Sequence, residues 1–499
     1  MEVTAALLLF LGLSLVVLLA VRGRGGSGGG RLPPGPTPLP LIGNLLQISP
    51  SQTLKSLLKL RDKYGPVFTV YLGTRRVVVL CGHEAVHEAL VGHAEEFAGR
   101  GRMPTVERTF HGHGVVFANG ERWKQLRRFS LTVLRDFGMG RHSLEGPIQE
   151  EAQCLVQEMR NTQGKPFDPT YMLSRAVSNI ICAMVFGKRF DYNDAELLEL
   201  LQMMNESFRE ISTPAAQLYE MSETLLQYFP GPQDKIYALL ESMRSFIARR
   251  VRCNAQSLEP SNPRDFIDCF LLQMEKEKNN PNSEFTMENL ELTALNLFFA
   301  GTETISSTLR YAFVLLMKNP SVLEKVHAEI DAVIGRERPP RVEDRPSMPY
   351  SDAVIHEVQR CADLIPMNVP HRVVRDTEFR GFLLPKGTDV YLCSARRCTT
   401  RPCLNSPTAS TPPTSWTAAA ASRRTTPSCP SPPGSGCAWG SRWRAWSSSC
   451  SSPPSCSTSS CSPCSPPSSC RTNRWRAASP TSPPSSSSKC CPAETPPPH

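Results

Sequence analysis

The pattern of apolar and polar positions predicts a mainly helical domain that also contains small β-sheets. Residues 67–72 and 76–80 are rich in β-branched side chains and flank Gly73-Thr74, which predicts a β-hairpin. Apolar residues then recur at helical spacing, in stretches separated by loops rich in Pro, Gly and Asn. These predicted helices cover residues 121–134, 150–159, 174–186, 195–208, 236–251 and 263–278.

The longest predicted helix covers residues 287–318 and ends at Asn319-Pro320. At a rise of about 1.5 Å per residue, this helix is about 48 Å long, which is enough to cross a large domain. Leu295, Leu297, Phe298, Phe299 and Ala300 make it apolar on nearly all sides, which predicts that this part of the helix is buried. We therefore expect the helix to form the centre of one large domain.

The motif Ala300-Gly301-Thr302-Glu303-Thr304 follows directly. Polar groups in a buried helix cost folding free energy unless a hydrogen-bond partner or a function compensates for their burial. Gly301 allows another group to approach the backbone or allows a local kink. Thr304 can donate to the carbonyl of Ala300 or hold a water, and Glu303 can relay a proton. The alternative is an ordinary helix contact in which Glu303 is paired elsewhere.

A second informative helix is predicted for residues 351–364, where Glu357 and Arg360 share one face. Pairs of this kind are common and carry little specificity alone. Short strands with Pro-Lys-Gly turns are predicted after it, at residues 370–373, 377–384 and 387–391.

The first residues resemble a membrane anchor. Residues 3–21 carry no charge, and a helix of this length spans about 28 Å, close to the ~30 Å hydrocarbon core. Arg22, Arg24 and Arg31 follow the span, which predicts that the rest of the chain faces the cytosol. A cleaved signal peptide is the alternative, although the basic start and the cleavage pattern are missing. We assign residues 1–21 to a transmembrane anchor and residues 22–36 to a flexible, then Pro-rich hinge.

Charge and composition change abruptly near residue 392. Residues 392–499 contain eleven Lys or Arg and one acid, together with 12 of the 18 Cys and 20 of the 45 Pro. The formal charge of +9 therefore belongs to this tail, while residues 1–391 are nearly neutral with a net charge of −1. A neutral body argues against a nucleic-acid partner. Its six scattered cysteines are typical of reduced core residues in an intracellular protein.

The order and spacing of several motifs over residues 1–391 resemble the cytochrome P-450 superfamily, and specifically its mammalian microsomal family 2, with most likeness to the olfactory-type and neighbouring subfamilies. Each motif is weak alone, and their succession is specific. The motifs are Pro33-Pro34-Gly35-Pro36, Asn119-Gly120-Glu121-Arg122-Trp123 with Arg127-Arg128-Phe129, Phe137-Gly138-Met139-Gly140, residues 262–266, residues 298–304, Met348-Pro349-Tyr350 with residues 352–357, and Arg380-Gly381 leading to residues 384–388.

The resemblance implies a cytochrome P-450 fold that binds haem and inserts one oxygen atom of dioxygen into lipophilic small molecules. It also implies electrons from an NADPH-dependent reductase and an endoplasmic reticulum membrane location. Thr304 and Glu303 would guide protons to bound dioxygen, and Glu357 and Arg360 would form a buried structural pair. The residues expected at the haem propionates are Arg100, Trp123, Arg127 and His371.

The chain departs from the family at the haem-ligating cysteine, which the family carries in the motif F-x-x-G-x-R-x-C-x-G. Cys437 lies near the expected place, but Pro430, Pro433, Ser435 and Trp439 occupy the other motif positions. We therefore interpret Cys437 as a decoy and expect no metal site in the tail.

The genetic code explains this departure. When the codons of residues 434–440 are read one nucleotide earlier, permitted choices spell G-K-R-V-C-V-G. The same shift spells E-S-L-A-R-M-E-L-F-L for residues 441–450 and P-L-L-G-S-A-L just after Tyr391. These strings resemble the family's missing C-terminal region, so we infer that one nucleotide was lost near the codons of Tyr391 and Leu392.

The resulting division is an incomplete haem-thiolate monooxygenase domain at residues 37–391 and an out-of-frame, disordered tail at residues 392–499. Loss of the segment that covers Glu357 and Arg360 would leave buried charge uncompensated, so we expect a poorly folded product. Three interpretations stay open: a monooxygenase by descent that is inactive as written, a non-enzymatic membrane-anchored relic that binds lipophilic ligands or partners, and an active enzyme whose recorded sequence contains an error.

Overall fold

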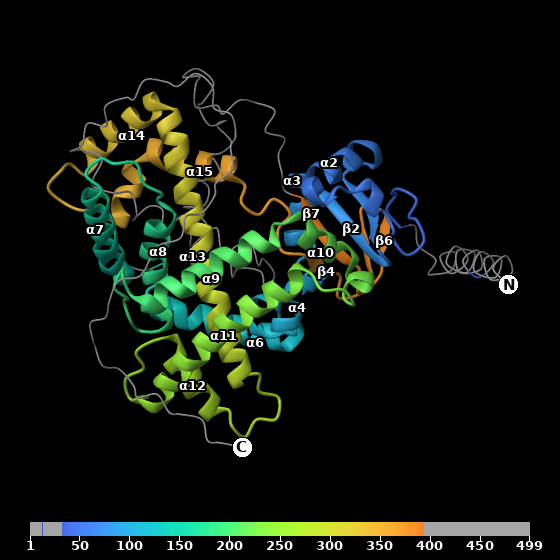
Figure 1. Ribbon diagram of the computed structural model, residues 1–499, viewed down its shortest axis with the longest axis horizontal. Helices are drawn as coiled ribbons and strands as arrows, with labels where there is room; N and C mark the ends of the chain where they lie inside the picture. The colour runs from blue at the N-terminus through green and yellow to red at the C-terminus, as the bar shows by residue number, and fades with distance from the viewer. Residues whose placement is uncertain (1–11, 13–31, 141, 394–499) are drawn as a thin grey trace. The chain divides into compact units, whose positions relative to one another are not determined.

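The computed structural model describes residue 12 and residues 32–140 and 142–393, and these residues form a mainly helical fold with two small sheets (Figure 1). The predicted anchor at residues 3–21, apart from Gly12, lies outside the described residues, as does the tail from residue 394. Within the described part of the chain, no helix is long and apolar enough to cross a membrane.

The larger sheet has five strands in the order β1-β2-β7-β4-β3. The predicted hairpin is confirmed, because β1 (Val67–Leu72) pairs antiparallel with β2 (Arg75–Cys81). The C-terminal strand β7 (Asp389–Cys393) lies parallel to β2 and antiparallel to β4 (His371–Arg372). A two-residue strand, β3 (Gly99–Arg100), completes the sheet at its other edge.

The second sheet is the hairpin of β5 (Thr377–Phe379) and β6 (Phe382–Leu384). The three predicted C-terminal strand regions are therefore confirmed. The strand that ends the described chain runs to Cys393, two residues beyond the predicted boundary at residue 391.

The helices surround one long central helix, α13, and their chain order is seen in Figure 1. Their bounds are α2 Thr53–Tyr64, α3 His83–His87, α4 Pro104–Phe110, α5 Gly114–Phe117, α6 Gly120–Asp136, α7 Glu145–Asn161, α8 Thr170–Val185, α9 Ala195–Ile211, α10 Pro214–Leu226, α11 Pro232–Gln256, α12 Phe266–Lys276, α13 Met287–Lys318, α14 Pro320–Val333 and α15 Pro349–Ala362.

Local capping explains two differences from the predicted bounds. The helix expected from residue 263 begins at Phe266, because the Asp265 side chain accepts a hydrogen bond from the backbone N–H of Asp268 at 2.8 Å and caps the helix. The helix expected to reach residue 364 ends at Ala362, because Asp363 adopts a left-handed backbone with φ of 35°.

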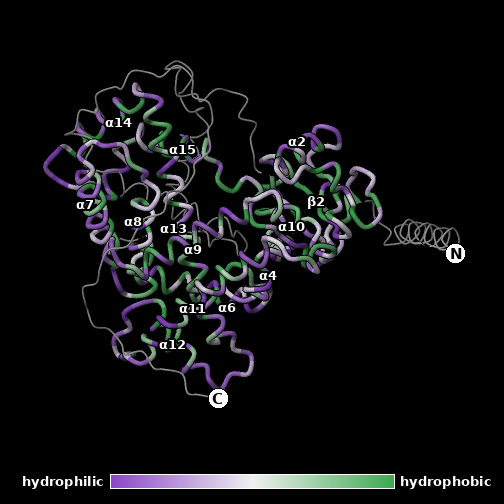
Figure 2. The backbone as a smooth tube through the Cα atoms, viewed as in Figure 1, coloured by the Kyte–Doolittle hydropathy of each residue, from purple (hydrophilic) through white to green (hydrophobic). Residues whose placement is uncertain are grey.

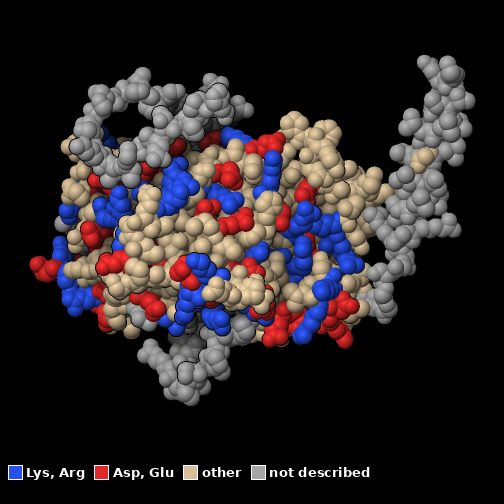
Figure 3. Space-filling model, turned by 90° about the horizontal axis from the view of Figure 1, so that it is seen from below, with Lys and Arg blue, Asp and Glu red and all other residues tan. Residues whose placement is uncertain are grey.

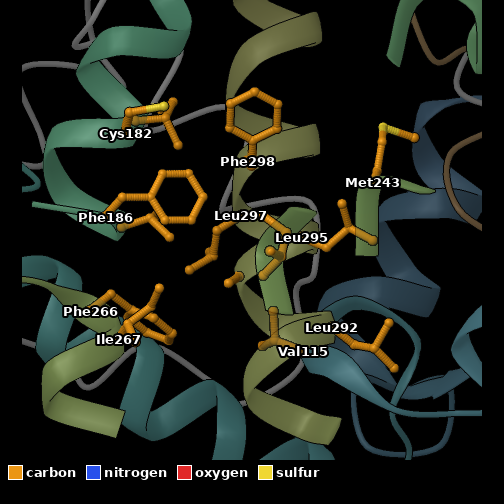
Figure 4. Close-up of a cluster of buried hydrophobic side chains, with 14 of the residues drawn as sticks. Val115, Cys182, Phe186, Met243, Phe266, Ile267, Leu292, Leu295, Leu297 and Phe298 are labelled. Carbon is orange, nitrogen blue, oxygen red and sulfur yellow. The ribbon is translucent and has the colours of Figure 1, made fainter. Parts of the chain in front are cut away.

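Helix α13 has the predicted bounds, and Thr286 caps it by accepting from the backbone N–H of Asn289. Helices α5, α8, α11 and α12 pack along it. Figure 4 shows Leu292, Leu295, Leu297 and Phe298 of this helix among apolar side chains from those neighbours. The predicted buried segment is confirmed for Leu295 to Phe298, whereas Phe299 is half-buried and Ala300 is exposed.

Polar and apolar positions separate as the pattern predicts. The tube in Figure 2 is hydrophobic along β2. In this strand, Val77, Val78 and Val79 are fully buried. On the described part of the face in Figure 3, basic and acidic side chains are interspersed rather than segregated. This mixture agrees with the neutral charge of the body.

We predict that Phe298→Ala destabilises the fold by about 3–5 kcal/mol, because Phe298 is fully buried at the centre of the core. Met317→Ala is the matched control on the same helix, since Met317 is 67% exposed and its loss should change stability by less than about 0.5 kcal/mol. The midpoint of urea unfolding, followed by helical circular dichroism in detergent solution, measures both. Equal midpoints for the two variants would refute this account of the core.

Candidate functional site

The polar motif of α13 interrupts an otherwise apolar helix at Gly301. A Cβ atom at this position would lie 2.6 Å from Cδ1 of Ile181, which belongs to α8. Of the two roles expected for Gly301, the structure therefore assigns the close approach of another group. One turn later, the Thr304 hydroxyl donates to the carbonyl of Ala300 at 2.8 Å, as expected.

Glu303 is held within its own helix. Its Oε1 accepts from the Ser307 hydroxyl at 2.6 Å and from Arg310 at 3.0 Å. Arg310 also donates to the Thr170 hydroxyl at 3.3 Å, which ties the ion pair to α8. This arrangement corresponds to the alternative in which Glu303 is paired elsewhere. The other carboxylate oxygen of Glu303 is buried and has no hydrogen-bond partner among the described residues.

One face of α13 is open among the described residues. Ala300 is exposed and Thr304 is half-buried, and the same helical face continues to Tyr311 and Val314. Tyr311 is 49% exposed and Val314 is 44% exposed, which is unusual for large apolar side chains on a central helix. The face beside the Thr304 hydroxyl is therefore free to meet an apolar group.

Two of the expected propionate residues meet where β3 pairs with β4. Arg100 and His371 are register partners, and Nη1 of Arg100 lies 3.0 Å from Nε2 of His371. Arg100 also donates from Nε to the carbonyl of Val116 at 3.0 Å. Nδ1 of His371 lies 2.6 Å from the carbonyl oxygen of Phe97.

These contacts fix the protonation state of His371. A carbonyl can only accept, so Nδ1 carries the proton, and Nε2 then accepts from Arg100. Burial and the neighbouring Arg100 charge lower the pKa of His371 from 6.5 to about 4, against a smaller opposite effect of the Phe97 carbonyl. His371 is therefore neutral at physiological pH.

The other two expected residues lie on α6. The guanidinium of Arg127 lies 5.4 Å from the ring centre of Trp123, which is nearly buried. Arg127 is half-buried and has no acidic partner among the described residues, and burial lowers its pKa. A buried cation without a counter-charge favours an anionic ligand.

Asn119 joins the two pairs. Its side chain accepts from the backbone N–H of Arg100 at 2.6 Å, and its carbonyl accepts from the backbone N–H of Trp123 at 3.4 Å. The sequence reasoning did not single out this residue. Asn119 precedes the first residue of α6 but makes no side-chain capping bond, so no local pattern predicted its contact with Arg100.

Glu357 and Arg360 form the expected pair on α15, with two hydrogen bonds of 2.6 Å. The guanidinium lowers the pKa of Glu357, while partial burial opposes this effect. Their side chains are 23% and 31% exposed, so the pair is partly solvated rather than fully buried.

The described residues also bring His142, Glu145 and Glu343 together in the arrangement of a possible cation site. Nδ1 of His142 lies 2.9 Å from Glu343, and both side chains are exposed. A surface ion pair accounts for these contacts.

Comparison with known proteins identifies the class of this fold and site. A sequence model of the cytochrome P-450 family matches residues 33–396, so the chain belongs to the cytochrome P-450 family.

Its relatives place it in family 2 of these proteins. It is 63% identical over 361 residues to cytochrome P-450 2G1 of the rabbit Oryctolagus cuniculus and 62% identical to the protein of that name from Rattus norvegicus. It is 57% identical to cytochrome P-450 2A6 of Homo sapiens. Each comparison covers 72% of this chain and 73% of the relative.

Membership of the family implies a haem cofactor, and the described residues fit the propionate end of haem. Arg127 offers a half-buried cation without an acidic partner, which suits a propionate. None of the seven described cysteines lies in the haem-ligating motif of the family, and Cys437 lies outside the described residues.

We predict that His371 makes the fold acid-sensitive. Its pKa is lowered in the folded state, so its contribution is complete above pH 6.5 and is lost as the pH falls toward about 4. The loss should reach about 3 kcal/mol. Urea-unfolding midpoints measured from neutral pH down to about pH 4 test this expectation.

His371→Gln should flatten this pH profile, and His356→Gln should leave it unchanged because His356 is an exposed residue of α15. An unchanged profile in His371→Gln would show that the acid sensitivity has another origin.

Proposed function

We propose that this chain is by descent a haem-thiolate monooxygenase of lipophilic small molecules, and that as written it binds no thiolate-ligated haem and is inactive. One observation carries the proposal: the family's cysteine motif is missing from residues 430–439, yet permitted codons for these residues can spell it after a shift of one nucleotide.

The extent of the family match supports a change of reading frame. The match ends at residue 396, a few residues after the inferred shift, while the chain continues to residue 499. The change in composition at residue 392 coincides with this boundary. We propose residues 37–391 as the incomplete monooxygenase domain and residues 392–499 as the out-of-frame tail.

The expected roles of the site residues follow from their geometry. Arg127, Trp123 and Arg100 would hold the haem propionates, and neutral His371 would hold Arg100 in position. Haem, where bound, would supply the activation of dioxygen with electrons from an NADPH-dependent reductase. Because Arg310 already neutralises Glu303, the proton nearest the reacting group would be carried by the Thr304 hydroxyl, which lies on the open face of α13.

We also propose an endoplasmic reticulum membrane location, with residues 1–21 as the anchor and the body in the cytosol. The apolar span and the following arginines support this orientation. The bilayer, the reductase and lipophilic small molecules are the proposed partners, and the neutral body argues against nucleic acid.

A non-enzymatic relic that binds lipophilic ligands is the second candidate. The open face of α13 at Tyr311 and Val314 favours it, since this surface can accept an apolar molecule without haem. Binding of a lipophilic fluorescent probe by the haem-free chain would support this candidate, while absence of binding would leave only the inactive monooxygenase.

We predict that the purified chain gives no thiolate-type carbon-monoxide difference spectrum. One nucleotide inserted between the codons of Tyr391 and Leu392 should restore both the spectrum and NADPH-dependent turnover, because it restores the cysteine motif. Cys437→Ser in the chain as written should change nothing. A thiolate-type spectrum from the chain as written would refute the claim of inactivity.

We predict that Arg127→Met, made in the frame-restored chain, lowers haem affinity by about tenfold or more, because a charge-assisted contact to a propionate is lost. Arg128→Met is the matched control, since Arg128 is the next residue and is exposed. The ratio of haem to protein after gel filtration measures the effect. Equal haem retention in both variants would remove Arg127 from the proposed site.

A further inference from the structure

Two cysteines that are far apart in the sequence face each other in the larger sheet. Cys81 is the last residue of β2 and Cys393 is the last residue of β7, and they are register partners in the parallel pairing. The backbone N–H of Gly82 donates to the carbonyl of Cys393 at 3.0 Å, so the pairing persists to the ends of both strands.

The two side chains lie on the same face of the sheet. Cys81 and Cys393 pack in one apolar cluster, whereas their neighbours Leu80 and Leu392 pack in the cluster on the opposite face. Neighbouring strands lie about 4.8 Å apart. This separation falls within the range of about 4.4–6.8 Å that Cα atoms show across disulfides.

The two thiols are chemically unequal. A side-chain hydrogen bond from Cys393 lowers the pKa of Cys81, and the Arg61 charge acts in the same direction, while burial and Asp62 oppose them. The same contact and burial raise the pKa of Cys393. Cys81 is therefore the better nucleophile of the pair, and Cys393 retains its proton.

We propose that Cys81 and Cys393 form a dithiol pair that a peroxide converts into a disulfide between β2 and β7. The Cys81 thiolate attacks one peroxide oxygen, the O–O bond breaks and hydroxide leaves, which gives a sulfenic acid. The sulfur of Cys393 then attacks the sulfur of Cys81, and a second hydroxide leaves. The two thiols lose two electrons and two protons, and hydrogen peroxide becomes two waters.

Burial limits the rate of this step rather than its outcome. Cys81 is 3% exposed and Cys393 is fully buried, so the oxidant reaches them when the strand ends open locally. Both residues end their strands, where such opening is easiest. The step needs neither haem nor the monooxygenase activity, and it rests on the proposed function only in that Cys393 belongs to the reading frame as written.

Tryptic peptides give a direct test. Cleavage after Arg76 and Arg100 yields residues 77–100, and cleavage after Lys386 and Arg396 yields residues 387–396, so each peptide contains one cysteine of the pair. The full chain, reduced and then treated with hydrogen peroxide in detergent solution, should give these two peptides joined by a disulfide. Iodoacetamide added before digestion prevents later exchange.

The same oxidation in concentrated urea is the control for folding. Once the strands separate, Cys393 should pair with tail cysteines that are close in sequence, such as Cys398 and Cys403. The joined peptides should therefore be at least about tenfold more abundant from the folded chain. Equal abundance in urea would overturn the proposal, and so would recovery of both peptides as alkylated thiols.

Two variants complete the test. Cys393→Ser should abolish the cross-link and leave Cys81 as a sulfenic acid that dimedone traps. Cys182→Ser should leave the cross-link unchanged, because Cys182 is equally buried but lies on α8 and pairs with no strand. Loss of the cross-link in Cys182→Ser would overturn the assignment of the pair.

Discussion

The pairing of β7 with β2 and β4 is the interaction on which the rest of the structure depends. It holds the last described strand against a strand more than 300 residues earlier in the chain. The carboxylate of Asp389, the first residue of β7, accepts from Arg372 at 2.8 Å and from Arg75 at 3.4 Å. Asp389 is only 1% exposed, so two arginines on two different strands stabilise one buried charge. The same pairing holds β4 beside β3 and thereby brings His371 to Arg100.

The sequence predicted those features that local patterns determine. The hairpin at residues 67–80, the helix α13 and the bond from Thr304 to Ala300 depend on residues close together in the chain, so spacing and residue type sufficed. The long-range contacts could not be predicted in this way. Neither the bond between Asn119 and Arg100 nor the parallel partner of β2 has a signature at one position. Glu303 illustrates the limit, because the helical pattern allowed both a proton relay and the pairing with Arg310 that the structure contains.

Glu357 and Arg360 are not the source of instability that the sequence predicted. A fully buried pair stripped of its covering segment would be costly. The observed pair is 23% and 31% exposed, and each partner neutralises the other, so water reduces that penalty. The open apolar face of α13 is the larger source of instability, because Tyr311 and Val314 are each more than two-fifths exposed. Among the described residues this helix is buried on one side and exposed on the other, an arrangement that favours association and aggregation over complete loss of the fold.

The proposed change of reading frame would be tolerated over a short distance at the end of β7. The first two residues after the inferred shift, Leu392 and Cys393, are apolar and fully buried. They continue the alternation of β7, because Leu392 packs on one face of the sheet and Cys393 on the other. A buried strand requires only apolar side chains on both faces of the sheet and backbone groups that pair with its neighbours. Residues read from another frame can therefore satisfy both requirements. The family's haem-ligating cysteine motif requires particular residues at five fixed positions, and residues 430–439 match only one of them, Cys437. Under the proposed shift, fold and chemistry would therefore respond differently: Leu392 and Cys393 continue β7, while the family's cysteine motif would be lost.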